Sequence, residues 1–410
     1  MRSPQPIELE RARSEVLARA APLGAEEVPL REALGRHLAE DVVATEPVPG
    51  FDNSAMDGFA VRARDTLGAQ PGAPAVLRVR GESRAGHPAD GALGAGEAVA
   101  ISTGAAIPVG ADAVVRVEAT RVEDGGVAVE EEVEPGRDVR RAGEDVRAGE
   151  AVLTAGSPVG PAEMGVLASL GAATAACHRR PRVAVLTSGD ELLEPGEETR
   201  PGGVRNSNAY SVPALARLAG AEVSVAGPVA DDPGATRAAI ELALDSDVAI
   251  VCGGVSVGEH DHVKPALAEL GVEERFWGVA LKPGKPAWFG ARGDTLVFGL
   301  PGNPVSAMVV FILLARPALV ALAGGQPGRL RASAVLEGEC EKRPGRAHAV
   351  RCRLELGDDG WHAHPFARQG SHVLSSMLGV NCLALLPRDA GTVPAGERVE
   401  IELLDLACGR

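Results

Sequence analysis

The chain changes its pattern of apolar and polar positions several times. Residues 7–20 place apolar side chains at helical spacing with charges on the opposite face, which predicts an amphipathic helix. Residues 31–42 show a similar pattern and predict a second helix. Between about residues 46 and 145, short β-rich runs alternate with Gly/Pro turns, which predicts a small β domain. The pattern at 160–171 is helical again, and we expect that helix to pack on the first two.

Residues 178–327 alternate strands and helices. Apolar runs at 182–189, 222–227 and 247–254 predict buried strands, and the stretches at 207–219 and 231–244 predict helices between them. Asp231 or Asp232 can cap the second helix, with Pro233 in its first turn. Such alternation predicts a largely parallel sheet covered on both faces. The apolar stretch 306–322 predicts a long buried helix, and residues 330–405 are again β-rich.

These patterns predict an α/β plus β fold with several domains. A central three-layer α/β domain is expected at 178–327 and a β-rich domain at 46–145. The segments 1–45 and 146–177 form a discontinuous helical or linker domain in this prediction. Residues 328–410 form a C-terminal domain that resembles a β-barrel.

Composition narrows the class of protein. The formal net charge of −15 argues against a nucleic-acid-binding protein, which needs a basic surface. We find no apolar run as long as the ~18–20 residues of a membrane span, and the charged N-terminus does not resemble a secretory signal. Six Cys without a CxxC pair indicate reduced thiols. We therefore expect a cytoplasmic protein that binds neither nucleic acid nor a membrane.

Two predicted strands end in polar loops, at 187–191 and 252–261. Parallel neighbours would bring both loops to one edge of the sheet, where α/β proteins bind ligands. The second loop offers backbone N–H groups to an anion, from Gly253, Gly254, Ser256 and Gly258. Glu191 and Asp261 would then be carboxylates beside a phosphate, which suits Mg²⁺. The alternative is a pair of turns with helix-capping acids.

Lysine is scarce in this chain, with four residues against 37 arginines. Three of the four lie between 264 and 285, and the turn KPGKP can present Lys282 and Lys285 to one oxyanion. The segment LPGNPVSA places Asn303 in a turn and Ser306 in the first turn of the long helix, where N–H groups favour an anion. A solvated turn and a structural cap are the alternatives.

Further candidates lie outside the α/β region. Asp57, in the turn-rich segment 47–63, is either a turn cap or a carboxylate that reaches a neighbouring site. Thr103 follows a predicted strand, and Arg346 and Ser371 lie in polar segments of the last domain. The pairs His260/His262 and His362/His364 have short spacing without an acidic partner pattern, so we do not expect a zinc site.

Nine segments, in order, together resemble one family. They are FDNSAMDGFAVRA, STGA, TSGDEL, NSNAY, ADDP, GGVSVGEHD, KPGKP, GLPGNPVSA and RQGSH. The family is that of the molybdopterin molybdenumtransferases, which includes the C-terminal enzymatic part of the scaffold protein gephyrin. The resemblance covers about residues 7–405 and implies that the α/β domain is of the molybdopterin-binding type.

The resemblance implies the final step of molybdenum cofactor synthesis. Adenylylated molybdopterin and molybdate react, AMP is released and molybdenum is bound by the dithiolene. It also implies Mg²⁺, a homodimer with an active cleft between the α/β domain of one subunit and the β-rich domain of the other, and transient contacts with other enzymes of the pathway.

The motifs also carry residue roles. By resemblance Asp57, Thr103, Glu191 and Asp261 are catalytic, the last two as metal ligands. Substrate would contact the backbone of the 253–258 loop and the following side chains: Asp231, Lys282, Lys285, Asn303, Ser306, Arg346 and Ser371.

One position departs from the family pattern, since Gly278 stands where the family often has Lys. Two other classes remain open. A molybdopterin adenylyltransferase would share the α/β domain but lack the extra β domains. A non-catalytic pterin-binding or assembly paralogue would keep the glycines and lose the acids, whereas Asp57, Glu191 and Asp261 are present.

Overall fold

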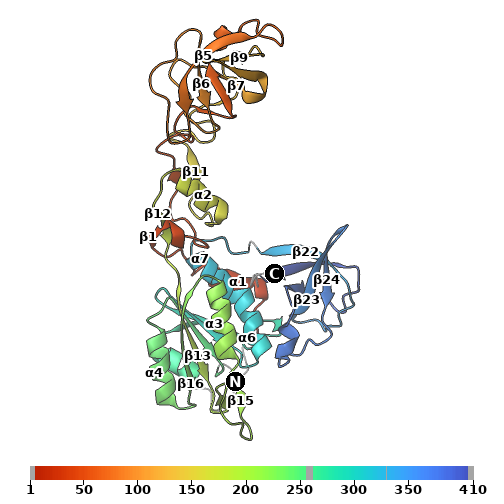
Figure 1. Cartoon of the computed structure of the whole chain (residues 1–410). Coiled ribbons are helices and arrows are strands. Elements are labelled where there is room, and N and C mark those ends of the chain that lie inside the picture. Colours follow the sequence, from red (N-terminus) through yellow and green to blue (C-terminus); the bar gives the residue numbers. More distant parts are fainter. Residues whose placement is uncertain (1–4, 255–261, 329, 405–410) are drawn as a thin grey trace.

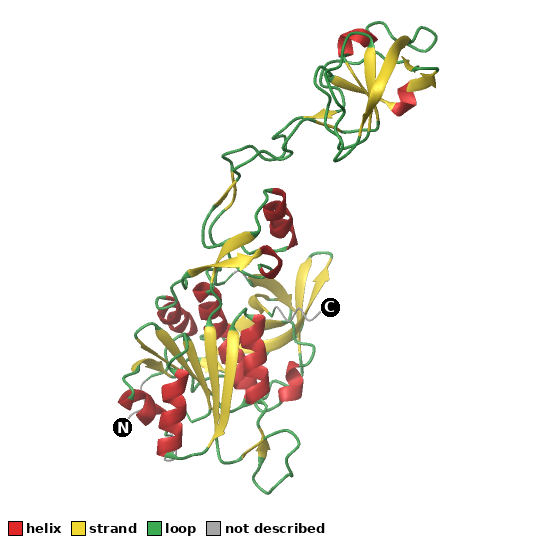
Figure 2. Cartoon of the chain, turned by 60° about the vertical axis from the view of Figure 1, so that its left-hand side comes forward, coloured by secondary structure: helices red, strands yellow, loops and turns green. Residues whose placement is uncertain are grey.

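The computed structural model of the chain describes residues 5–254, 262–328 and 330–404. The molecule is elongated (Figures 1 and 2). A β-rich domain lies at one end, and the α/β domain and the C-terminal barrel lie side by side at the other. A narrow middle region, built from residues 25–48 and 146–178, connects them.

The α/β domain has three layers around a six-stranded sheet of order β16-β13-β17-β21-β20-β18. Four strands are parallel: β13 (Arg182–Ser188), β16 (Glu222–Val229), β17 (Val248–Cys252) and β21 (Thr295–Leu300). The other two, β18 (Glu273–Trp277) and β20 (Trp288–Arg292), are antiparallel to their neighbours. The prediction of a largely parallel sheet is therefore correct, since four of its six strands are parallel.

Helices cover both faces of this sheet. One face packs on α4 (Pro233–Ala243) and α5 (Val263–Glu269). The other face packs on α3 (Asn208–Leu218), on α1 (Leu9–Leu17) and on the helix that follows β21. Asp232 caps α4 as its sequence predicts, because its carboxylate accepts the Ala235 N–H at 2.8 Å and Pro233 occupies the first turn.

The long apolar helix runs from Pro304 to Leu322. It comprises α6 (Pro304–Val310), a π-turn at Phe311–Ala315 and α7 (Arg316–Leu322). The helix has 19 residues, and an 18-residue window of it has a mean hydropathy of 2.3, so by length and composition it could span a membrane, contrary to our expectation from the sequence. However, 72% of the apolar window is buried inside the protein, as expected for a core helix.

The middle region differs from the prediction. The expected helix at 31–42 is wrong, since only a 3₁₀ turn forms, at Leu30–Glu32. Gly35 adopts a φ of 74°, and the Leu38 N–H donates to the Ser157 carbonyl at 3.0 Å. Backbone pairing with a distant segment therefore overrides the helical pattern.

Short strand pairs build the rest of the middle region. β1 (Ala25–Pro29) pairs with β12 (Thr174–His178), and β2 (Val42–Val43) pairs with β11 (Ala151–Leu153). The helix α2 (Pro161–Ser169) packs on this region. The prediction that it packs on the first helix is wrong, because the buried side chains of α1 belong to the core of the α/β domain.

The β-rich domain contains a six-stranded sheet of order β7-β4-β6-β5-β9-β8, with a separate pair formed by β3 (Asn53–Ser54) and β10 (Val139–Arg140). The strands of the sheet are β4 (Gly58–Val61), β5 (Ala75–Ser83), β6 (Glu97–Ile101), β7 (Ala113–Arg116), β8 (Thr120–Glu123) and β9 (Gly126–Val129).

The C-terminal domain is a small closed barrel, because β23 pairs with both β24 and β25. Its strands are β22 (Arg331–Leu336), β23 (Ala347–Gly357), β24 (Gly360–Pro365), β25 (Cys382–Leu386) and β26 (Arg398–Leu403). The short strand β19 (Leu281–Lys282) leaves the α/β domain and pairs in parallel with β23, which places Lys282 opposite His348.

A buried ion network also joins the barrel to the α/β domain. Glu402 is 3% exposed and accepts hydrogen bonds from Arg13 of α1 at 2.8 Å and from Arg316 of α7 at 2.6 Å. The Arg13 Nε donates to the Leu313 carbonyl at 3.1 Å. A buried carboxylate is costly without such partners, so the three elements are held in one arrangement.

We predict that Arg13→Ala destabilises this half of the molecule by roughly 3 kcal/mol, because Glu402 stays buried with one cation fewer. Urea unfolding followed by tryptophan fluorescence measures it, since Trp277 and Trp288 lie in the α/β domain. The control is Arg237→Ala, whose partner Glu241 is exposed, and its cost should stay below about 0.5 kcal/mol. Equal costs for the two variants would show that the buried network contributes little.

Candidate active site

The carboxyl ends of the parallel strands bring several polar groups together. Asp231, just beyond β16, accepts the Ser188 hydroxyl at 3.0 Å and the Asp190 N–H at 3.2 Å, and its own N–H donates to Asp190 at 3.1 Å. Since β13 and β17 are neighbours, the loops after both strands lie at this edge. Gly253 has a φ of 96°, and a Cβ there would lie 2.9 Å from the Ser188 carbonyl oxygen, so this close approach requires glycine.

Glu191 lies at the same edge with an exposed side chain. Its carboxylate folds back over Gly189, where a Cβ would lie 2.5 Å from the Glu191 Oε2. It makes no hydrogen bond or ion pair to any residue that the structure describes, so its oxygens are available to a ligand. Within residues 5–254, 262–328 and 330–404, no three His, Cys, Asp or Glu side chains are arranged to hold a metal ion.

Three predicted site residues, Ser256, Gly258 and Asp261, lie outside the described residues. Gly254, the last described residue before them, adopts a φ of 62°. The roles of these three residues therefore stay predictions.

A polar network behind this edge was not anticipated from the sequence. Asn206 donates to the Thr187 hydroxyl at 3.0 Å and to Glu194 at 2.9 Å, and the Tyr210 hydroxyl donates to Glu194 at 2.8 Å. This last hydrogen bond raises the pKa of Tyr210. The network lies next to the short strands β14 (Leu192–Leu193) and β15 (Val204–Arg205) and holds the end of β13. The sequence feature that could have pointed to this network is the scarcity of Asn and Tyr in the chain.

The beginning of α6 meets a loop of the barrel. Ser306 is buried, and the Val305 N–H donates to the Ser371 carbonyl at 3.3 Å, so the structure brings these two segments together. Asn303 precedes the helix, with an exposed side chain that makes no capping hydrogen bond. Asn208 instead supports this turn, since its amide donates to the Gly302 carbonyl at 2.8 Å.

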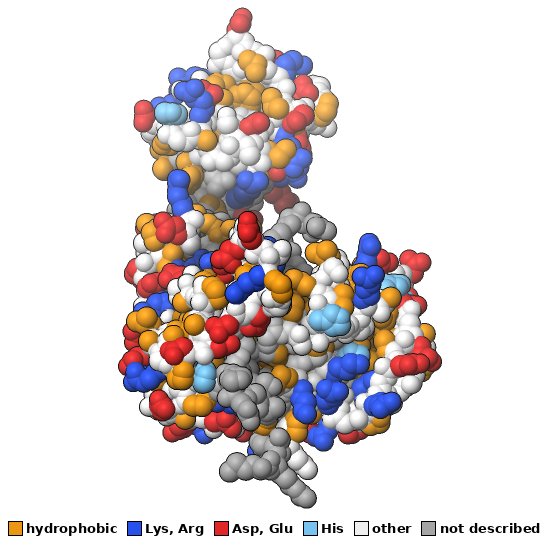
Figure 3. All heavy atoms as spheres, turned by 90° about the horizontal axis from the view of Figure 1, so that it is seen from below, with side chains coloured by type: hydrophobic (Ala, Val, Ile, Leu, Met, Phe, Trp, Pro, Cys, Tyr) orange, Lys and Arg blue, Asp and Glu red, His pale blue; other side chains and the backbone are white. Residues whose placement is uncertain are grey.

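The lysine turn lies against the mouth of the barrel. Lys282 and Lys285 are both exposed, and Lys282 lines a cavity of about 400 Å³. The barrel contributes the remaining lining residues, Glu341, Lys342, Arg343, Pro344, Arg346, His348 and Thr392. The structure thus brings Lys282 and Arg346 to one basic cavity. In Figure 3, Lys and Arg side chains gather on the lobe to the right.

Lys342 has a structural function in this cavity. Its ammonium donates to the carbonyls of Pro387 at 2.8 Å, Arg388 at 3.2 Å and Ala390, and burial lowers its pKa. Lys282, Arg343 and Arg346 differ, because none of them forms an ion pair with a described residue. Their charges are therefore available to an anion.

The backbone conformation at residue 278 explains why this residue is glycine. It adopts a φ of 87°, a region that side chains disfavour, and its carbonyl accepts the Ile7 N–H at 3.0 Å. The N-terminal segment therefore pairs with this turn, at the position where the family often has lysine.

Asp57 and Thr103 lie together in the β-rich domain. The Thr103 N–H donates to the Asp57 carboxylate at 2.6 Å. The next residue must be glycine, because a Cβ on Gly58 would lie 1.9 Å from the Val115 carbonyl oxygen. Nearby, Arg116 forms a bidentate pair with Asp138 at 2.8 and 3.0 Å, and Arg116 lowers the pKa of Asp138.

Within one chain, this pair is far from the α/β loops. The β-rich domain lies at the opposite end of the molecule (Figures 1 and 2), so the structure does not bring Asp57 and Thr103 to Glu191 or Lys285. The residues of the predicted site are therefore divided into two groups, one at each end of the elongated molecule.

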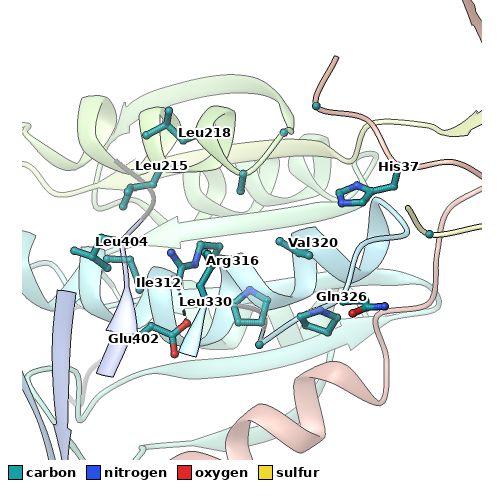
Figure 4. A pocket seen from close by; sticks show the side chains of 17 residues that line it. His37, Leu215, Leu218, Ile312, Arg316, Val320, Gln326, Leu330, Glu402 and Leu404 are labelled. Atoms are coloured by element: carbon teal, nitrogen blue, oxygen red, sulfur yellow. Dashed lines mark hydrogen bonds and ion pairs between the residues drawn. The ribbon is translucent and has the colours of Figure 1, made fainter. Parts of the chain in front are cut away.

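A separate, mostly apolar cavity of about 260 Å³ lies between α3, α7 and the middle region. Figure 4 shows Leu215 and Leu218 of α3 on its wall, Val320 of α7 nearby, and the Arg316–Glu402 pair beside them. None of the predicted site residues lines this cavity.

The fold and these groups define a multidomain α/β protein whose strand ends and barrel mouth suit an anionic ligand. Three family models match it: "MoeA N-terminal region (domain I and II)" at 7–171, "Probable molybdopterin binding domain" at 184–321, and "MoeA C-terminal region (domain IV)" at 333–404. The chain belongs to the MoeA family of molybdopterin molybdenumtransferases. The resemblance inferred from the sequence motifs is thereby confirmed.

Relatives of known name cover nearly the whole chain. It is 38% identical over 402 residues to the molybdopterin molybdenumtransferase of Haemophilus influenzae, covering 97% of this chain and 98% of the relative. It is 39% identical to molybdopterin molybdenumtransferase 2 of Mycobacterium tuberculosis, covering 91% and 94%. The crystal structure of a molybdopterin biosynthesis MoeA protein from Pyrococcus horikoshii has a TM-score of 0.83 at 31% identity, covering 98% of this chain and all of that one. The predicted fold class is confirmed.

Proposed function

We propose that this protein inserts molybdenum from molybdate into adenylylated molybdopterin and releases AMP, which is the final step of molybdenum cofactor synthesis. The observation that carries this proposal is the basic cavity at the barrel mouth, where Lys282 and Arg346 form no ion pair with any residue that the structure describes. A cavity of this charge suits a small oxyanion such as molybdate.

The loops at the strand ends would hold the phosphate-bearing pterin. Gly253 and Gly254 allow the backbone to approach a phosphate, and Asp231 fixes the turn beside them by accepting the Ser188 hydroxyl and the Asp190 N–H. Ser306 and Ser371, which lie where the barrel meets α6, would complete the molybdate pocket with Lys285. Asn303 would contact substrate from the turn before α6.

Mg²⁺ would bind through Glu191 and Asp261. The available oxygens of Glu191 are the donor type that Mg²⁺ prefers, so this carboxylate suits the ion. The described residues supply no group of three acidic, His or Cys ligands, and Asp261 lies outside them. When bound, the ion neutralises charge on the phosphates of the substrate. The protein's own part is to position those phosphates against the loop backbone.

Asp57 and Thr103 would act in the active cleft of a second subunit. Their distance from the α/β loops of the same chain supports a homodimer in which each site takes its β-rich domain from the partner. Apolar side chains exposed on α3 support such an interface, since Leu218 is 50% and Tyr210 55% exposed. We place the dimer in the cytoplasm, where the enzyme that supplies the adenylylated substrate would contact it transiently.

The direct test is AMP release from adenylylated molybdopterin by the purified protein. We expect release only when molybdate and Mg²⁺ are both present, because the two anionic substrates must be held together. Release without molybdate would contradict the coupled reaction. Turnover of ATP with molybdopterin would instead identify an adenylyltransferase.

The shared site can be tested by subunit complementation between Asp57→Ala and Lys285→Ala. At a molybdate concentration well below the wild-type dissociation constant, each variant alone should have little activity, since every site lacks one component. After subunit exchange, the mixture should recover about a quarter of wild-type activity, because half of the dimers are mixed and one of their two sites is intact. Mass spectrometry of differently tagged subunits verifies that the subunits have exchanged. If activity does not recover after exchange, either both residues act in the site of the same chain or the protein is not a dimer.

The choice of lysine in the turn can be tested at Lys285. Lys285→Ala should weaken molybdate binding by about 10- to 150-fold, corresponding to about 1.5–3 kcal/mol for one charge-assisted contact. Lys285→Arg should also be impaired, since a planar guanidinium replaces a compact ammonium. A molybdate titration of AMP release measures both. A wild-type curve for Lys285→Arg would show that any cation suffices, and an effect on pterin binding alone would move Lys285 to the phosphate end.

A further inference from the structure

His348 occupies an unusual position at the mouth of the barrel. It lines the basic cavity of about 400 Å³ and also a neighbouring cavity of about 450 Å³, so the residue belongs to the walls of both. Strand pairing places it opposite Lys282, and Arg346 is two residues before it on the same segment. The backbone of the paired strands therefore places Lys282, Arg346 and His348 in the wall of one cavity.

The imidazole of His348 is buried without a partner. The residue is 4% exposed, and neither ring nitrogen has a hydrogen-bond partner among the residues that the structure describes. Buried polar groups in proteins are nearly always hydrogen-bonded, so an unpartnered imidazole in the wall of a cavity indicates a missing ligand. A solvated surface histidine would carry no such information.

The surroundings of the ring are strongly charged. Burial, together with the nearby cations of Lys282, Arg351, Lys342 and Arg346, lowers the pKa of His348 to about 4. The other charged or titratable groups that line the two cavities are Arg343, Glu337, Glu339, Cys340, Glu341 and His364. At neutral pH the ring is therefore uncharged, and the cations around it oppose its protonation.

A dianion bound in the cavity would favour protonation of His348. Its charge would offset Lys282, Arg343 and Arg346, and its oxygens would accept hydrogen bonds from an imidazolium, which has two N–H donors. Binding of the anion and binding of a proton must then favour each other, because the linkage between two ligands is reciprocal.

We propose that His348 is a ligand of the oxyanion in the barrel mouth and takes up a proton when the oxyanion binds. This proposal rests on the proposed function, since it concerns the molybdate pocket that contains Lys282 and Arg346. It adds a binding residue and a direction of pH dependence: the pocket binds molybdate more tightly as the pH falls from 8 to 6.

The experiment is a calorimetric titration of the full-length protein with molybdate between pH 6 and 8, in two buffers of different ionisation enthalpy. Wild-type protein should bind molybdate about 10-fold more tightly at pH 6 than at pH 8, with uptake of up to about one proton per anion at the lower pH. His348→Gln keeps a polar side chain but cannot titrate, so its affinity should be lower at pH 6 and nearly independent of pH. His87→Gln, an exposed histidine of the β-rich domain, should behave as wild type.

The outcomes separate the two proposals. The role of His348 would be overturned if wild type and His348→Gln bound molybdate with the same pH profile, or if wild type bound it without taking up a proton. Either result would leave the proposed function intact. Failure of wild-type protein to bind molybdate at any pH would overturn both. If His348→Gln does not fold, the buffer dependence of the wild-type binding enthalpy still decides whether a proton is taken up.

Discussion

A two-residue parallel pairing between β19 and β23 holds the lysine turn against the mouth of the barrel. It joins Leu281 to Ala347 and Lys282 to His348, and the Ala347 N–H donates to the Ala280 carbonyl at 2.7 Å. So short a pairing needs support, which the buried Arg13–Glu402–Arg316 network supplies from a second direction. The basic cavity exists because two domains are fixed at this point.

Charge differs between the strand ends of the α/β domain and the mouth of the barrel. Carboxylates lie at the ends of β13 and β16, whereas the barrel mouth has cations that form no ion pair with a described residue. A ligand that carries phosphates can use the first through a divalent ion and the second directly. The remaining acid, Asp57, accepts the Thr103 N–H at the far end of the molecule. In the proposed dimer, this carboxylate could reach the site of the partner subunit.

The scarcity of lysine located important positions without revealing their roles. Lys342 is surrounded by three carbonyl oxygens, a geometry that suits a compact ammonium with three donors. Lys264 stacks on the Trp277 ring at 4.5 Å. Only Lys282 and Lys285 lie in the turn next to the cavity, so the same compositional signal covered structural and candidate binding residues.

Local chemistry in the sequence determined the elements of the α/β domain and its capped helix, because burial periodicity and the Asp232–Pro233 start act within a few residues. The ordered motifs likewise sufficed for the family. Only the tertiary structure decided that residues 31–42 form no helix, that α1 packs on the α/β domain, and that His348 is buried among cations. Each of these depends on contacts between segments far apart in the chain, which no local pattern encodes.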